Sequence, residues 1–172
     1  FLKARGHEVQ VITPTDYPNF ISWLPGNDQV LEFNSVQYPN ASYIFFVRNL
    51  TSEAINVRAE VLNISGTDGS MMEFCFGECY FGISLGLSYP LSSYVSIEPG
   101  ETQVSSGDHF FNQDPGDGTN PVEYSFRFYM VDQNGDEVVS IPELQTDYRV
   151  NYLYSSNLGL NEYDSLNLSL IH

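Results

Sequence analysis

The sequence predicts an all-β fold, either a sandwich of two packed sheets or a barrel. Aromatic residues make up 15% of the 172 residues, with 12 Tyr and 12 Phe, and these side chains suit a pleated, half-buried surface. Apolar and polar residues alternate with period two from about residue 29 onward. Clusters of Gly, Pro, Asn and Asp interrupt the alternation at short intervals, which is typical of folds built from many short strands.

Nine segments have the composition and alternation of strands. They are Gln29–Gln37, Ser42–Arg48, Ala54–Asn63, Met72–Tyr80, Tyr94–Ile97, Asp108–Phe111, Val122–Val131, Glu137–Ile141 and Asp147–Tyr154. Ser42–Arg48 is almost continuously apolar, which is typical of a central strand. The alternation in Val122–Val131 places four large side chains on one face of the strand: Tyr124, Phe126, Phe128 and Met130.

These segments divide the chain into three parts. Residues 28–154 hold the predicted sandwich, and residues 1–27 are predicted to be an N-terminal extension or the end of a preceding segment. Residues 155–172 are predicted to be a linker, because Gly, Asn and Ser are frequent there. Four sequons, at Asn40, Asn49, Asn63 and Asn167, predict surface loops.

The charge of the chain restricts its partners. Six basic residues stand against 22 acidic ones, for a net charge of −16. Such a surface repels phosphate backbones and anionic membranes, so we expect neither nucleic acid binding nor membrane insertion. The sequence has no apolar run long enough for a transmembrane helix. The charge indicates an exported protein kept soluble by its acids, or one that binds cations such as calcium.

The two cysteines, Cys75 and Cys79, are predicted to form a disulfide. Two thiols with no histidine nearby in the sequence do not complete a tetrahedral zinc site, and the spacing is not the Cys-X-X-Cys of redox enzymes. Residues four apart on an extended strand lie about 13 Å apart, whereas a disulfide tolerates Cα separations up to roughly 7 Å. We therefore expect the backbone to turn at Phe76-Gly77-Glu78, with Gly77 as the pivot. The disulfide also indicates an oxidising compartment.

Six segments together resemble a known module. They are Phe74–Tyr80, Ile97–Glu101, His109–Phe111, Asp114–Gly118, Tyr124–Tyr129 and Tyr148–Tyr154. In this order they resemble the Ig-like domain that precedes the sorting signal in proteins exported by the Bacteroidetes type IX secretion system. Leu158–Leu170 is similar to the lead-in to a type IX sorting domain, although the chain ends without the Tyr-Pro-Asn-Pro hallmark. The resemblance implies an Ig-like antiparallel β-sandwich of about 7–9 strands in a secreted or cell-surface bacterial protein.

Two loops have the side chains that calcium prefers. Oxygen ligands recur at EF-hand spacing in the segment from Asp132 to Glu143, with Asp132, Asn134, Asp136 and Glu143 as candidate ligands. Position six of that loop, however, is Glu137 where an EF-hand needs Gly, and Asn134-Gly135 is a strong β-hairpin signal. We therefore predict a hairpin, with calcium at its tip as the alternative. Asp114–Gly118 is a second acidic loop of ordinary turn residues.

The remaining candidates define two functional hypotheses. His109 has no poised nucleophile beside it in the sequence and is predicted to pack among aromatic neighbours, and no catalytic residue is identified. The leading hypothesis is a non-catalytic accessory, adhesion or spacer domain without a required cofactor, whose partners are neighbouring domains of the same polypeptide. The alternative is a carbohydrate-binding module that recognises sugar through exposed aromatic side chains, with or without calcium. Under these hypotheses the outside partner is a glycan or a host or cell-surface protein. The candidate ligand residues are Trp23, Tyr89, Tyr94, Tyr129 and Tyr152.

Overall fold

The structure is a computed structural model that describes residues 9–12, 29–103, 108–138 and 148–156. These residues form strands, turns and loops and contain no helix. The strands are β1 (Val9–Ile12), β2 (Gln29–Phe33), β3 (Ser42–Ile44), β4 (Phe46–Asn49), β5 (Ile55–Ser65), β6 (Met72–Phe76), β7 (Glu78–Phe81), β8 (Ser88–Tyr89), β9 (Val95–Ile97), β10 (His109–Asn112), β11 (Val122–Val131) and β12 (Tyr148–Tyr154). The predicted all-β class is confirmed.

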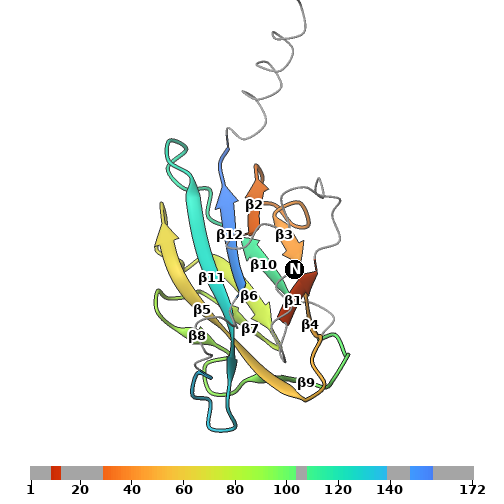
Figure 1. Cartoon of the computed structure of the whole chain (residues 1–172). Coiled ribbons are helices and arrows are strands. Elements are labelled where there is room, and N and C mark those ends of the chain that lie inside the picture. The colour runs from red at the N-terminus through yellow and green to blue at the C-terminus, as the bar shows by residue number, and fades with distance from the viewer. Residues whose placement is uncertain (1–8, 13–28, 104–107, 139–147, 157–172) are drawn as a thin grey trace, which may run out of the picture.

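Two sheets pack face to face, as Figure 1 shows. The larger sheet has the order β2-β12-β11-β5-β8, with β9 also paired to β5, and the smaller has the order β3-β10-β6-β7. The sandwich is therefore confirmed, and β1 pairs with β4 beside it. The pairing is antiparallel except between β2 and β12, which run parallel. Since these two strands lie far apart in the chain, no hairpin constrains their relative direction.

The core lies between the sheets and is mostly aromatic. Phe110 of the smaller sheet has its ring centroid 4.6 Å from that of Phe126 on β11 and 4.7 Å from that of Phe45. The predicted inward face of β11 is confirmed, because Tyr124, Phe126 and Phe128 are fully buried and Met130 is 9% exposed. Interlocked rings of this kind fix how the two sheets sit against each other.

The segment Ser42–Arg48 differs from its prediction as a central strand. It breaks at Phe45, and its halves pair with different strands: β3 lies at the edge of the smaller sheet, and β4 pairs with β1. The burial of successive side chains alternates here although all of them are apolar: Tyr43 and Phe45 are buried, whereas Ile44 is 49% exposed. The apolar composition alone therefore did not reveal which face is covered. The break is held by the amide of Phe45, which donates to the carbonyl of Asp108 over 3.1 Å.

Other strand assignments also differ from the prediction. Gln29–Gln37 ends as a strand at Phe33, and the two-residue β8 was not predicted. Within the described residues, the predicted strand from Glu137 is a single bridge between Glu137 and Val131, and residues 139–141 lie outside them. Short edge pairings of this kind carry too few residues to show a period-two pattern.

A buried polar network crosses the core near β10. Asn112 is fully buried; its Oδ1 accepts from the Tyr124 hydroxyl over 3.1 Å, and its Nδ2 donates to the carbonyl of Asp114 over 2.8 Å. The hydroxyl of Tyr152 donates to the carbonyl of Ala41 over 2.6 Å. Burial raises the pKa of Tyr124 to about 12 and also raises the pKa of Tyr152.

We expect the protein to lose stability as the pH rises from about 10, the ordinary tyrosine pKa, through about 12, the pKa of Tyr124 in the fold. In that range the folded state holds phenolic protons that the unfolded state has released, so the free energy of unfolding falls with pH. Alkaline unfolding followed by circular dichroism and phenolate absorbance measures the effect. Tyr124→Phe should have a shallower pH dependence, and an unchanged slope would contradict the assignment.

Candidate functional site

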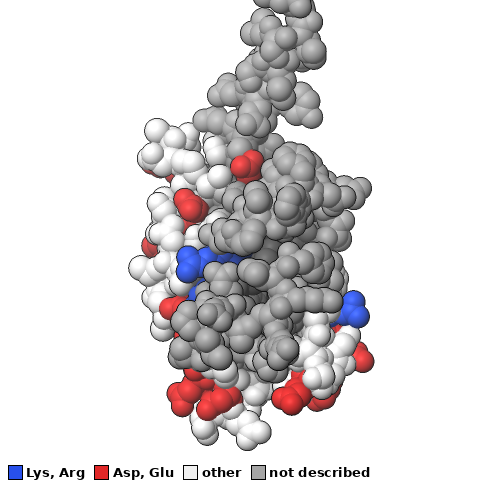
Figure 2. All heavy atoms as spheres, in the orientation of Figure 1, with Lys and Arg blue, Asp and Glu red and all other residues white. Residues whose placement is uncertain are grey.

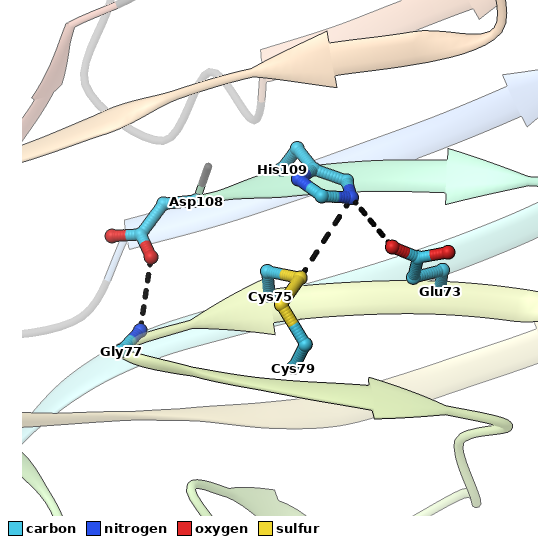
Figure 3. Close-up of a disulfide and its surroundings, with 6 residues drawn as sticks. All are labelled: Glu73, Cys75, Gly77, Cys79, Asp108 and His109. Atoms are coloured by element: carbon cyan, nitrogen blue, oxygen red, sulfur yellow. Dashed lines mark hydrogen bonds and ion pairs between the residues drawn. A yellow bond between two sulfur atoms is a disulfide. The ribbon is translucent and has the colours of Figure 1, made fainter. Parts of the chain in front are cut away.

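Among the described residues, the candidate site is the group of side chains that surrounds the disulfide on the smaller sheet. Three neighbouring strands, β10, β6 and β7, carry it, with β6 in the middle. Cys75 on β6 is the register partner of Cys79 on β7 and of His109 on β10. Glu73 stands two residues before Cys75 on the same strand and so points to the same side. Figure 3 shows the four side chains close together.

The predicted turn and disulfide are confirmed. Gly77 reverses the chain between β6 and β7 with φ of +68°, a conformation that favours glycine. This turn brings the Cα atoms of Cys75 and Cys79 to 4.0 Å and joins them in a disulfide. The amide of Gly77 donates to Oδ1 of Asp108 over 2.9 Å, so a buried carboxylate holds the turn from the neighbouring strand segment (Figure 3).

His109 lies in polar surroundings and not among aromatic rings as predicted. Its Nε2 is 3.1 Å from Oε1 of Glu73 and 3.7 Å from Sγ of Cys75. Its side chain is 15% exposed and that of Glu73 is 33% exposed, so the group borders solvent. Because strand pairing across the sheet was not predictable from the sequence, the neighbours of His109 were missed. The alternation of His109 with buried Phe110 was the available signal, since it places the histidine on the outer face.

The prediction that no histidine lies near the cysteines holds in the sequence but not in the fold. Glu73, Cys75 and His109 each offer a ligand atom, and these atoms lie within 4.8 Å of one another. While the disulfide is closed, Sγ of Cys75 is bonded to Cys79 and is not a thiolate. Metal ligation by sulfur requires the thiolate. The group is therefore two side chains with metal-binding chemistry, Glu73 and His109, beside a closed disulfide.

The predicted calcium loop forms a hairpin turn. The amide of Asp132 donates to the carbonyl of Asp136 over 2.8 Å, and Gly135 takes φ of +85°. The Asp132 carboxylate accepts from the amides of Asp136 and Asn134, and these bonds hold the pKa of Asp132 below its usual range. The carboxylate thus closes the turn itself. Glu143 lies outside the described residues.

We expect this hairpin to form without metal, so that calcium and a chelator leave the melting temperature unchanged. The physical reason is that Oδ1 of Asp132 already accepts two backbone hydrogen bonds. A bound ion must raise the melting temperature by mass action. Calorimetry of the protein in calcium and in chelator makes the comparison. A rise in calcium that Asp132→Asn abolishes would instead establish the alternative of calcium at the hairpin tip.

The second acidic loop is also closed by its own carboxylates. Oδ1 of Asp114 accepts from the amide of Gly116 over 2.8 Å. Oδ1 of Asp117 accepts from the amides of Asn120 and Thr119, which hold the pKa of Asp117 below its usual range. Both carboxylates therefore act as turn acceptors, as the ordinary composition of the loop predicts.

Three of the predicted ligand tyrosines are buried, and the prediction that they are exposed is wrong. Tyr89 is 2% exposed, Tyr129 is 7% exposed and Tyr152 is fully buried. The hydroxyl of Tyr129 donates to Ser88, and the guanidinium of Arg127 covers the Tyr129 ring at 4.6 Å. Tyr94 is partly exposed, and Trp23 lies outside the described residues. The three buried rings do not form an exposed stacking platform, because neighbouring side chains cover the ring faces that a sugar would need to contact.

Comparison with solved structures finds distant likeness, and comparison with family models and curated proteins finds none. Among solved structures, the chain is similar to the N-terminal domain of PorA, with 13% identity and a TM-score of 0.47 over 87% of this chain and 98% of that one. So distant a likeness assigns neither a family nor a function to the chain. Within the described residues, no helix is long and apolar enough to cross a membrane.

Proposed function

We propose that this chain is a non-catalytic accessory domain, a spacer or adhesion module, of a secreted or cell-surface bacterial protein. Its partners are neighbouring domains of the same polypeptide, and its sandwich is of the Ig-like kind. The sequence resemblance of residues 74–154 to the domain that precedes type IX sorting signals supports both the class and the export route. The sandwich core supports a structural role, because the large side chains of its buried residues pack against one another between the sheets.

The observation that carries the export proposal is the disulfide on an exposed hairpin. Cys79 and Glu78 are exposed, so a reductant has access to the bond. The thiol systems of the cytosol reduce accessible disulfides, whereas disulfides persist in oxidising compartments. A closed bond at this place is therefore expected of a protein that works outside the cytosol.

The surface charge supports the same proposal. On the face of the molecule drawn in Figure 2, the described residues show many acidic side chains and few basic ones. Lys and Arg number 6 in the whole chain against 22 Asp and Glu. This charge favours solubility and disfavours nucleic acid and anionic lipid as partners.

The test follows the full gene product in the bacterium that makes it, with and without a working type IX export apparatus. In cells with a working apparatus, we expect a protease added to intact cells to digest the domain at the cell surface. Thiol titration of the denatured domain should find Cys75 and Cys79 oxidised. Without the apparatus, the domain should accumulate inside the cell envelope with its disulfide formed. Surface display that does not depend on the apparatus would remove the type IX route and keep export. Recovery from the cytosol with two free thiols would overturn the export proposal.

A second experiment tests the accessory role. Deletion of residues 28–154 from the full gene product should abolish its retention or display at the surface. Any catalytic activity of the remaining polypeptide should persist, because the proposed accessory role assigns no catalytic residue to the domain. Loss of catalytic turnover, with the remaining polypeptide still folded, would overturn the non-catalytic assignment.

A further inference from the structure

We propose that reduction of the Cys75–Cys79 disulfide converts this hairpin into a zinc site with the ligands Cys75, Cys79, His109 and Glu73. The site is closed to metal while the disulfide is intact and open to metal when it is reduced. The inference concerns the chemistry of the hairpin itself and does not depend on the proposed accessory role or on the export route.

The strand register places four ligands around one point. Cys75 lies directly opposite Cys79 on one side and directly opposite His109 on the other. Directly opposite residues in antiparallel strands have Cβ atoms about 4.5–5.5 Å apart on the same face. Glu73, two residues along β6, lies on that face as well. Two sulfurs, one imidazole and one carboxylate form a donor set that zinc accepts.

The distances match a tetrahedral ion. With bonds of about 2.0 Å to N and O and about 2.3 Å to S, zinc places its N and O ligands about 3.3 Å apart and its S and N ligands about 3.5 Å apart. Nε2 of His109 lies 3.1 Å from Oε1 of Glu73 and 3.7 Å from Sγ of Cys75. Both distances from Nε2 are therefore close to those of a bound ion, and the three ligand atoms lie within 4.8 Å of one another. Sγ of Cys79 has to move away from Sγ of Cys75 to about 3.8 Å, within reach of a rotation of its side chain.

The hairpin has anchors other than the disulfide. The amide of Gly77 donates to Asp108 at the turn, and the amide of Gly82 donates to the carbonyl of Met72 over 2.9 Å at the other end. The hydroxyl of Tyr80 accepts from the amide of Leu91 over 2.9 Å, which ties β7 to the segment after β8. The bonds at Gly77 and Gly82, together with the antiparallel pairing of β6 and β7, keep β7 beside β6 when the sulfur bond opens, so the thiols remain next to His109.

The redox step balances with a dithiol as the reductant. One thiolate of the dithiol attacks Sγ of Cys79, the more exposed of the two cysteines, the bond between the two cysteine sulfurs breaks, and the Cys75 sulfur leaves with the electron pair. The second thiol of the reductant then closes its own disulfide and releases Cys79. Two electrons and two protons pass from the dithiol to the two cysteines. Zinc displaces the two thiol protons as it binds, because sulfur ligates as the thiolate.

The test uses the full chain, reduced without oxygen and freed of reductant, and titrated with cobalt as the spectroscopic probe. We expect one equivalent of cobalt to give sulfur-to-cobalt charge-transfer absorption and the strong visible bands of a tetrahedral ion. Zinc should then displace the cobalt and abolish the bands. The oxidised chain should give neither signal. If the reduced chain gives no tetrahedral spectrum at one equivalent, the proposal is wrong.

Variants identify the ligands. Replacing a hydrogen-bonding partner of a metal ligand costs about 10- to 100-fold in affinity, and we expect at least this loss for His109→Gln and Glu73→Gln. Glu78→Gln is the matched control, since this carboxylate lies on the same hairpin but hydrogen bonds to Tyr80 and Ser93, and its affinity should not change. Far-ultraviolet circular dichroism of each variant checks folding, and the comparison of oxidised with reduced chain needs no variant. An unchanged affinity in folded His109→Gln would show a plain dithiol complex and overturn the four-ligand site.

Discussion

Replacing Phe110 with alanine should lower the free energy of unfolding by about 3–5 kcal/mol, the usual cost of deleting a buried aromatic ring. Phe110 is fully buried and occupies the centre of the packing between the sheets. Its ring centroid lies within 5.3 Å of those of Phe45, Phe74 and Phe126. The rings come from both sheets, so they do not collapse easily into the space that the deletion leaves. The resulting cavity adds to the lost transfer free energy.

Urea denaturation followed by far-ultraviolet circular dichroism, with the disulfide kept closed in all samples, measures this loss. Phe81→Ala is the matched control, because it deletes the same ring from a position that is 67% exposed. Its effect should stay within about 0.5 kcal/mol. Equal losses at the two positions would contradict the central place of Phe110 in the core.

The sequence predicted what depends on local pattern. Alternation in Val122–Val131 placed the inward face of β11 correctly, and the separation of Cys75 from Cys79 was sufficient to predict the turn at Gly77. Both predictions rest on the geometry of a single extended strand, in which side chains point to the same face at every second residue and each residue adds a fixed length.

The local pattern of the sequence does not tell which strands pair, and so it does not tell which side chains become neighbours across a sheet. The neighbours of His109 became known only when β10 paired with β6, in a register that brings together residues 34 apart in the chain. The tyrosines illustrate the same limit, because composition does not tell which face of a sheet is covered. Tyr152 was a candidate ligand residue by type, yet its ring stacks on Phe33 at 4.4 Å inside the fold.

Asn49 is a third case, since its sequon predicted a surface loop and the structure buries it completely. Its Nδ2 donates to the carbonyls of Glu53 and Ile97 over 2.7 and 2.8 Å. Its Oδ1 accepts from the amide of Thr51 over 2.8 Å. One side chain therefore closes the loop after β4 and ties it to β9. The sequon is the wrong signal here, because an asparagine that satisfies buried backbone groups is not available to a glycosylating enzyme.

We expect Asn49→Asp to lower the free energy of unfolding by about 3–5 kcal/mol at neutral pH, the cost of an uncompensated buried charge. The substitution keeps the shape but removes the donor that serves two carbonyls, and a carboxylate facing two carbonyl oxygens is repelled by them. Near pH 4, the ordinary range of a carboxyl pKa, the difference from the wild type should shrink, because the protonated group is neutral and regains one donor. Asn40→Asp makes the same chemical change in an exposed turn and should have little effect. Denaturation of the three proteins at both pH values measures the difference, and a loss that does not depend on pH would show that the lost donor matters and the charge does not.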